Sequence, residues 1–326
     1  MTVKIATISF LLIVLSLAVS NPSQKLRGNL TKLTAQTEKP DKKNTMQSIL
    51  DDSAKLEKLA GDFQFIEGPI WHPDGFLLFS DIPANIIYKF GSNQQVEVFR
   101  SPSGKANGNT LDKENRLLTA EHENRRVSRT EKDGKVITLA DRYGGKRLNS
   151  PNDLVVKSDG SIYFTDPSYG VSKEQEELGF YGVYRLAPDG KLTLLVKDLV
   201  LPNGIAFSPD EQKLYVNNSE AGYIAVFDIK PDGTVTNQQL FAELKDASQK
   251  GVPDGLKVDV EGNVYSTGPG GVWILSPDGK LLGKISVPET ATNLAWGESD
   301  RKTLYITGST SLYRIRLKIA GVRAGK

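Results

Sequence analysis

The chain has 326 residues, of which 38% are hydrophobic and 25% are charged, and this composition excludes a disordered or fibrous protein. The formal net charge is only +2 and the basic excess lies near the N-terminus, so no nucleic-acid-binding surface is indicated. The sequence contains no cysteine, which excludes disulfides, thiolate metal sites and cysteine nucleophiles.

The first 20 residues have the pattern of a signal peptide. Lys4 is followed by an apolar run over residues 5–19, which ends in small residues at alternate positions that suit signal peptidase. An uncleaved anchor helix is the alternative, although a run this short barely spans a bilayer. We expect a secreted or periplasmic protein with no stable membrane span after cleavage.

Three further segments follow the signal. Residues 21–50 are polar and rich in Lys, Thr, Gln and Asn, which indicates a tether. Residues 51–319 consist of short apolar stretches broken by Gly, Pro, Asn and Asp, a pattern typical of an all-β domain. Residues 320–326 are expected to form a C-terminal tail.

One short motif recurs six times within residues 51–319. It is an apolar stretch after a turn, and its copies are spaced by 40, 45, 52, 50 and 40 residues, starting at Leu77, Leu117, Ile162, Leu214, Val264 and Leu304. Periods of about 40 to 50 residues are typical of propeller blades, none of which can bury both of its faces alone. We therefore predict a six-bladed β-propeller with four-stranded antiparallel blades around a central tunnel.

The last blade lacks a fourth strand of its own. Strands are expected over residues 68–71, 76–80, 86–90 and 96–100 in the first blade, whereas residues 312–317 form only the third strand of the last. Residues 55–59 precede the first repeat and are expected to fill that place. Closure of this kind removes the exposed sheet edges that favour aggregation.

A polar residue lies ten or eleven positions before each copy of the motif, at the entry to the innermost strand. All are carboxylates or carboxamides: Glu67, Asn107, Asn152, Asn203, Asp254 and Asn293. Equivalent positions of a propeller lie on one ring, so these side chains should converge at one mouth of the tunnel. Asn or Asp before Gly is also a common turn signal. Six matched positions, one of them a Glu, favour a site instead.

The oxygen atoms of this set predict a divalent-cation site. Ca²⁺ takes about six to eight oxygen ligands and is the first choice, with Mg²⁺, Mn²⁺ or Zn²⁺ as alternatives. Asp81, Asp166 and Asn218 follow second strands on the same face, as outer ligands or substrate contacts. His122 is either a base or substrate contact at this mouth or a structural histidine, and the long loop over residues 166–182, which carries Tyr169, is either a cap or a solvated hairpin.

The motifs around these positions resemble those of a known family. They are Glu67-Gly68-Pro69, Asn149-Ser150-Pro151-Asn152-Asp153 with Phe164-Thr165-Asp166-Pro167, Pro202-Asn203-Gly204 with Ser208-Pro209-Asp210, and Pro253-Asp254-Gly255. Over nearly all of residues 53–319 the chain resembles the senescence marker protein and gluconolactonase family of six-bladed, metal-dependent lactonases. The resemblance implies that Glu67, Asn152, Asn203 and Asp254 hold the metal. Some members carry an Arg where this chain has Ser150, which weakens the case for an aldonolactone.

The resemblance also implies hydrolysis of a small-molecule lactone or ester. The metal would polarise the carbonyl, with Asp254 as the first candidate for the base that activates water and Glu67 as the second. Direct attack by Asp254 is an alternative. Substrate contacts are expected from Asn107, Asn152, Asn293, Asp166 and His122.

Three other functions stay open for this fold. The first is a non-catalytic propeller that binds a protein or glycan partner, and the second is a phosphotriesterase that uses the same metal. The third is a condensing enzyme like strictosidine synthase, from which this ring of ligands would not be expected.

Overall fold

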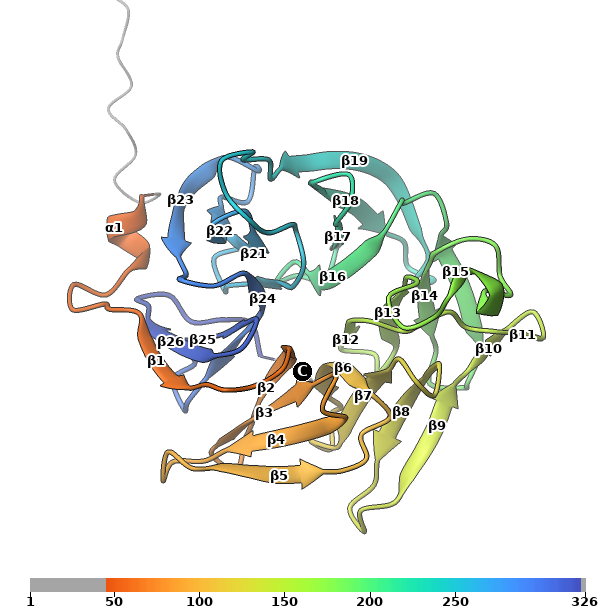
Figure 1. Ribbon diagram of the computed structural model, residues 1–326. Coiled ribbons are helices and arrows are strands. Elements are labelled where there is room, and N and C mark those ends of the chain that lie inside the picture. Colours follow the sequence, from red (N-terminus) through yellow and green to blue (C-terminus); the bar gives the residue numbers. More distant parts are fainter. Residues whose placement is uncertain (1–44, 324–326) are drawn as a thin grey trace, which may run out of the picture. The chain divides into compact units, whose positions relative to one another are not determined.

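Each repeat of the sequence forms one four-stranded antiparallel sheet, and six such sheets surround a central axis in the computed structural model (Figure 1). The structure describes residues 45–323; the expected signal peptide and most of the expected tether lie outside them. The predicted six-bladed β-propeller is therefore confirmed. Within residues 45–323 no helix is long and apolar enough to cross a membrane.

The two inner strands of each blade carry the repeat. The first strands are β2 (Ile66–His72), β6 (Ala106–Leu111), β12 (Leu154–Val156), β16 (Pro202–Phe207), β20 (Leu256–Val258) and β24 (Ala291–Gly297). The second strands contain the recurring apolar motif, and they are β3 (Phe76–Asp81), β7 (Leu117–Glu121), β13 (Ile162–Asp166), β17 (Lys213–Asn218), β21 (Val264–Gly268) and β25 (Thr303–Gly308). The second strands are buried on both faces between neighbouring blades, so each has consecutive apolar residues near its start rather than an alternating pattern, and polar residues follow toward its end.

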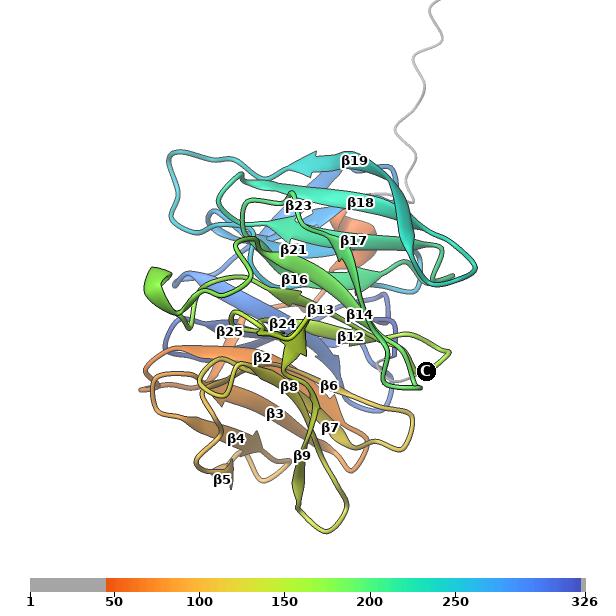
Figure 2. The same cartoon turned by 90° about the vertical axis from the view of Figure 1, so that its right-hand side faces the viewer.

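The two outer strands of each blade are more exposed. The third strands are β4 (Ile86–Phe90), β8 (Arg126–Thr130), β14 (Gly182–Leu186), β18 (Tyr223–Ile229), β22 (Gly271–Leu275) and β26 (Leu312–Arg316). The fourth strands are β5 (Val96–Arg100), β9 (Val136–Ala140), β15 (Leu192–Val196), β19 (Val235–Glu243), β23 (Leu281–Ser286) and β1 (Glu57–Ala60). Figure 2 shows β16 to β19 as successive strands of one blade. A short hairpin, β10 (Arg142–Tyr143) and β11 (Lys146–Arg147), precedes the third blade.

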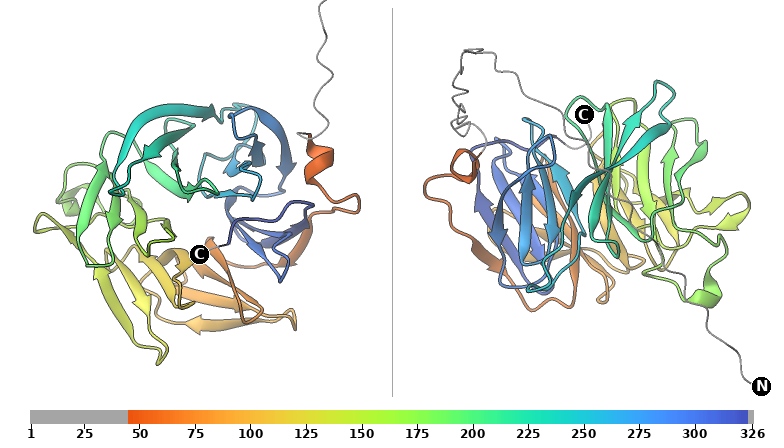
Figure 3. Two further views of the ribbon diagram at one scale, coloured as in Figure 1. Left: turned by 180° about the vertical axis from the view of Figure 1, so that it is seen from behind. Right: turned by 90° about the horizontal axis from the view of Figure 1, so that it is seen from above.

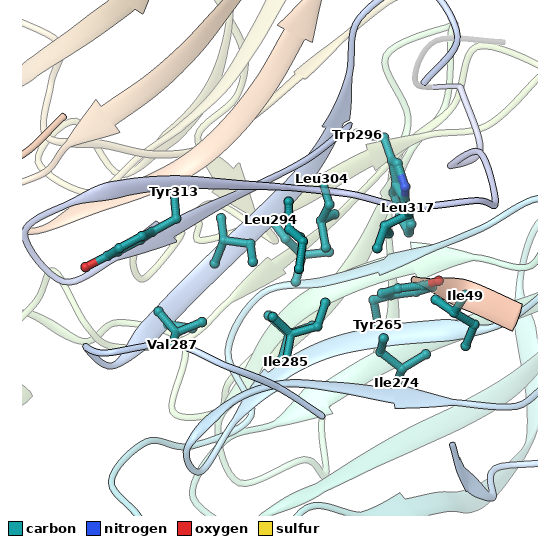
Figure 4. Packing of buried hydrophobic residues seen from close by; sticks show 14 of the residues in the cluster. Ile49, Tyr265, Ile274, Ile285, Val287, Leu294, Trp296, Leu304, Tyr313 and Leu317 are labelled. Atoms are coloured by element: carbon teal, nitrogen blue, oxygen red, sulfur yellow. The ribbon is translucent and has the colours of Figure 1, made fainter. Parts of the chain in front are cut away.

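The hydrophobic core is divided among the six interfaces between neighbouring blades. Each of six buried clusters draws its side chains from two adjacent blades. Figure 4 shows the cluster between the fifth and sixth blades, where Tyr265 and Ile274 of one blade face Leu294 and Leu304 of the other. A blade on its own would leave both faces exposed to water, so the complete ring is the stable unit.

The ring closes through its N-terminal strand. β1 pairs with β26 as the outermost strand of the last blade, with Glu57 opposite Arg314, whose Nε lies 2.8 Å from Glu57 Oε2. The expectation for residues 55–59 is thus confirmed, although the strand begins two residues later. On the inner side, the Thr292 hydroxyl donates to the carbonyl oxygen of Ile66 at 2.7 Å, which joins the sixth blade to the first.

The folded unit extends a little beyond residues 51–319 at both ends. One helical turn, α1 (Met46–Ile49), lies beside the last two blades (Figure 3), and its Ile49 is 1% exposed within their shared core. At the other end, Gly321 forms a bridge with Asp259 of the fifth blade. Residues 46–50 and 320–322 therefore pack on the propeller, where the sequence indicated tether and tail.

Leu294→Ala should lower the free energy of unfolding by about 2–5 kcal/mol, because Leu294 is completely buried between two blades and alanine leaves a cavity. Leu281→Ala is the matched control, since Leu281 on the fifth blade is 50% exposed. Chemical denaturation of both variants measures the difference. Equal losses would contradict a core that is built from the interfaces between blades.

Candidate active site

Backbone irregularities turn the ring residues toward the tunnel. Glu67, Asn107, Asn203 and Asn293 lie in first strands, and Asn152 and Asp254 lie two residues ahead of β12 and β20. In four blades the pairing of first and second strands shifts register at this point: between Glu67 and Ile70, Ala106 and Asn109, Pro202 and Ile205, and Ala291 and Asn293. Bulges of this kind re-aim side chains beside active sites.

The glycine after a ring residue makes a close contact with the next blade. A Cβ at Gly204 would overlap the carbonyl oxygen of Asp254, and the amide of Gly204 donates to that same oxygen at 2.8 Å. Gly68 packs in the same way on the carbonyl of Asn107. The Asn-Gly pairs of β6 and β16 therefore lie in strands and not in turns, which removes the alternative of simple turn formers at these positions.

Second strands brace the same carbonyl groups from the side. The Ser80 hydroxyl donates to the carbonyl of Asn107 at 2.8 Å. The bonds from Thr165 to Asn203 and from the Asn217 amide to Asp254 are equivalent, at 2.8 and 2.7 Å. The main chain of the ring is thus held by hydrogen bonds between blades, and its side chains are available to the tunnel. The sequence pattern did not indicate these donors, because Ser80, Thr165 and Asn217 are different residue types at equivalent positions of their strands.

The side chains of the ring contact one another and the walls of the mouth. The Asn293 amide donates to Glu67 Oε2 at 2.9 Å, and the amide of Gly68 donates to the same oxygen at 2.6 Å. Asn203 Nδ2 donates to the Tyr169 hydroxyl at 3.2 Å. Glu67, Asn203 and Asn293 are only 2–3% exposed, so these are bonds within a largely dry site.

Burial and mutual repulsion raise the pKa values of the carboxylates. Burial, with Asp153 adding to it, raises the pKa of Glu67 to about 7. Burial and the neighbouring Glu67 raise the pKa of Asp254 well above its ordinary range. Asp153, which directly follows the ring residue Asn152, is 2% exposed and acts on both. The buried Glu67 and Asp153 and the partly exposed Asp254 thus repel one another, and a bound cation would relieve that repulsion.

The donor set suits a hard divalent cation. Within the described part of the chain, no three His, Cys, Asp or Glu side chains gather so that they could hold a metal by themselves, so amide oxygens would have to contribute. Asn107 Oδ1 is buried and has no hydrogen-bond partner among residues 45–323. Oxygens of Glu67, Asn152, Asn203 and Asp254 complete a set of two carboxylates and amides, which matches Ca²⁺ preferences.

The polar residues that end second strands accept hydrogen bonds from backbone amides. Asp166 is completely buried, and its carboxylate accepts hydrogen bonds from the amides of Asn149 and Ser150 at 2.8 and 2.7 Å. Asp81 accepts from Gln64 and Phe65 in the same way, and Asn218 from Leu201. These side chains fix the segment that leads into each first strand. Asp166 therefore supports the site through Asn149 and Ser150, and a direct substrate contact by Asp166 stays a prediction.

The loop between β13 and β14 is fastened over the mouth. Besides the bond from Asn203 to Tyr169, the Gly170 amide donates to the Ser150 hydroxyl at 2.7 Å. Asn149 Nδ2 donates to the carbonyl of Phe180 at 2.9 Å, which holds the far end. The loop, which includes the short 3₁₀ helix η1 (Lys173–Gln175), therefore forms a cap and not a freely solvated hairpin.

The two histidines have different surroundings. His122 is 5% exposed at the mouth, where its Nε2 lies 3.1 Å from Asn107 Nδ2, and burial lowers its pKa to about 4. It is therefore neutral at physiological pH. His72 lies in the turn at the opposite mouth, where it stacks on Phe76.

Ser150 holds the position at which the resemblance implies an arginine in some members, and the buried Arg125 lies nearby, with its Nε donating to the carbonyl of Asn149 at 3.1 Å. Ser150 is completely buried and bonded to the cap. Arg147 directs its guanidinium to the carbonyl of Asn124, at 2.7 Å and in an exposed position. Among the described residues, the mouth presents amide, phenol, imidazole and carboxylate groups to a substrate.

Two residues near the ring were not identified from the sequence. Asp153 and Lys257 approach each other across the tunnel, with Lys257 Nζ 3.4 Å from Asp153 Oδ2. For Asp153, the one indication in the sequence of a place near the ring is its position directly after Asn152. Lys257 gave no signal, because nothing in its local sequence shows that it faces the third and sixth blades.

The fold and the ring define a six-bladed propeller with an acidic, oxygen-rich site at one tunnel mouth. The family model described as the SMP-30/gluconolactonase/LRE-like region matches residues 65–310. A gluconolactonase of Zymomonas mobilis is 38% identical over 303 residues, 85% of each chain. A pentonolactonase of Haloferax volcanii is 27% identical over 81% of this chain and 84% of its own.

The similarity extends to solved structures. A gluconolactonase of Xanthomonas campestris has a TM-score of 0.78 and 38% identity, covering 83% of this chain and 92% of that chain. The chain belongs to the SMP-30/gluconolactonase/LRE-like family, and the resemblance seen in its motifs is confirmed.

The raised pKa of Glu67 predicts a pH-dependent stability of the metal-free protein. Folding favours the protonated carboxyl group, so its contribution is present below the ordinary value of 4.5 and is lost as the pH rises toward about 7. In chelator, Glu67→Gln should therefore lose less stability than the wild type over this interval. Thermal unfolding at a series of pH values tests this, and parallel curves for the two proteins would contradict it.

Proposed function

We propose that the protein is a lactone hydrolase of the gluconolactonase type whose chemistry depends on a divalent cation, Ca²⁺ as first choice, at Glu67, Asn152, Asn203 and Asp254. The observation that carries the proposal is the placing of two mutually repelling carboxylates, the buried Glu67 and the partly exposed Asp254, among side-chain amides, which raises both pKa values. A scaffold that only bound a protein or glycan would gain nothing from this costly arrangement.

The substrate class is supported by the relatives together with the site. The gluconolactonase relative covers 85% of this chain, and both it and the pentonolactonase are named for sugar lactones. Tyr169, His122 and Asn107 line the mouth with groups that can bond to hydroxyls or to a ring oxygen. A small cyclic ester fits beneath the cap better than an extended polymer does.

Glu67, Asn152, Asn203 and Asp254 would hold the cation, which would supply polarisation of the lactone carbonyl. Asp254 takes the proton of the attacking water, because its carboxylate can accept a proton whereas the amide side chains of the ring cannot. The water oxygen forms a bond to the carbonyl carbon, the bond from that carbon to the ring oxygen breaks, and the proton passes to the ring oxygen. Glu67 as the base, or attack by Asp254 itself, are the alternatives.

Residues 1–20, which lie outside the described part of the chain, bear on location. We propose that they direct export and are removed, on the strength of the apolar run after Lys4. Intact-mass measurement of the protein purified from the extracytoplasmic fraction tests this, and a full-length mass would contradict removal.

Asp254→Asn should lower kcat/KM for lactone hydrolysis by about 100-fold or more while the fold is retained, because the amide cannot accept the proton of water. Asp278→Asn is the control, since Asp278 lies in an exposed turn of the same blade. A pH-stat assay measures acid release and circular dichroism measures folding. Wild-type turnover by Asp254→Asn would rule out its role as the base.

Chelation should abolish ring opening, and Ca²⁺ should restore it in the wild type. A panel of an aldonolactone, an acyl-homoserine lactone and a phosphotriester, assayed with Ca²⁺, Mg²⁺, Mn²⁺ or Zn²⁺ returned, ranks substrates and metals. Full activity in chelator would remove the cation from the mechanism, and a silent panel with metal bound would favour a binding protein.

A further inference from the structure

A lysine lies inside the tunnel, next to the acidic cluster. Lys257 belongs to β20 of the fifth blade, and its side chain is 24% exposed. Its Nζ lies 3.0 Å from the carbonyl oxygen of Leu256, 3.3 Å from Asn293 Oδ1 and 3.4 Å from Asp153 Oδ2. One ammonium group thus bonds to the fifth, sixth and third blades.

The bond to Asn293 orients a group that contacts the proposed cation site. Because Lys257 can only donate, the oxygen of the Asn293 amide faces it, and the NH₂ group faces Glu67 Oε2 at 2.9 Å. The same NH₂ group lies 3.5 Å from Asp153 Oδ2. The backbone amide of Leu294 donates to the same Asn293 oxygen at 2.8 Å, so Leu294 and Lys257 together orient the Asn293 amide toward Glu67.

Four charged side chains around the tunnel axis determine the net charge of the proposed cation site. Glu67, Asp153 and Asp254 interact with one another and carry three negative charges when ionised, and Lys257, which acts on Glu67, carries one positive charge. The neighbouring His122 is neutral. The total of −3 + 1 is −2, the charge that one divalent ion neutralises.

Lys257 also separates the ring from a second space. A cavity of about 480 Å³ opens at the opposite end of the tunnel, and Lys257 lines it together with Leu154, Ile205 and Val258. On its other side, Lys257 contacts Asp153 of the acidic cluster. The ammonium is thus a fixed part of the floor beneath the ring.

We propose that Lys257 is a positioning residue that sets the charge of the cation site to −2 and so makes it selective for divalent over trivalent ions. The inference rests on the proposed function, because it concerns the same site. Lys257 repels any cation at the ring, and it repels a trivalent ion more strongly because that ion carries one more charge. Without Lys257 the cluster would carry −3 and would suit a trivalent ion.

The test compares Tb³⁺ with Ca²⁺, using Tb³⁺ luminescence and Ca²⁺ competition on the full-length protein. Lys257→Met should raise the ratio of Tb³⁺ affinity to Ca²⁺ affinity by about tenfold or more, since one unit charge at close range in a partly buried site has an effect of this size. Lys257→Arg keeps the charge and should keep the ratio. Lys157→Met is the matched control, because the Lys157 side chain is similarly accessible, with 19% of its surface exposed, but pairs with Glu211 away from the ring.

For a second variant, Asp153→Asn, we expect the opposite change in the ratio of Tb³⁺ affinity to Ca²⁺ affinity. Asp153→Asn lowers the negative charge of the cluster to −1 and should decrease the Tb³⁺ to Ca²⁺ ratio, so the inference is testable even if Lys257→Met does not fold. A purely structural role would weaken both ions equally and leave both ratios unchanged, and that result would overturn the proposal.

The outcomes also separate this inference from the proposed function. A wild type that binds Ca²⁺ and opens lactones, with ratios unaffected by Lys257→Met and Asp153→Asn, overturns the role of Lys257 alone. A wild type that binds neither ion overturns the cation site and the role of Lys257 together, and its lactone hydrolysis in chelator then shows whether the enzyme class still holds.

Discussion

The close approach of the first strands around the tunnel axis is the constraint on which the rest of this molecule depends. Neighbouring strands come so near that glycine follows four of the six ring residues, as at Gly204, whose Cβ would overlap the carbonyl of Asp254. The same carbonyl accepts bonds from Gly204 and from Asn217 of the neighbouring blade. Because its main chain is fixed by partners on both sides, the ring can present polar side chains to the tunnel without losing their positions.

This rigidity has an electrostatic consequence. Carboxylates that could move apart would relieve their repulsion and keep ordinary pKa values. Glu67 and Asp254 are held together in a buried ring, so their pKa values rise, and a cation is the natural means of stabilising their ionised forms. The same reasoning applies to Lys257, because its single positive charge changes the net charge of the cluster from −3 to −2.

The cap adds chemistry to the ring. The loop between β13 and β14 contributes Tyr169 and is fastened by Ser150, at the position where the resemblance implies an arginine in some members. A phenol and a small hydroxyl in place of a guanidinium leave fewer cationic contacts for substrate oxygens. We therefore expect substrate preference within the lactone class to be determined by this loop more than by the ring.

The sequence by itself determined the six blades, their strands, the closure by an N-terminal strand and the six ring positions. It could do so because each blade repeats one pattern of turns and apolar strands, and equivalent positions must be related by rotation about the axis. Only the tertiary structure decided that Asp166 binds backbone amides and that Lys257 reaches Asp153 and Asn293. The contacts of Lys257 join residues from different blades, 104 positions apart for Lys257 and Asp153, and no local pattern records them. Their distances depend on how the blades close around the axis, which is a property of the whole ring and not of any one repeat.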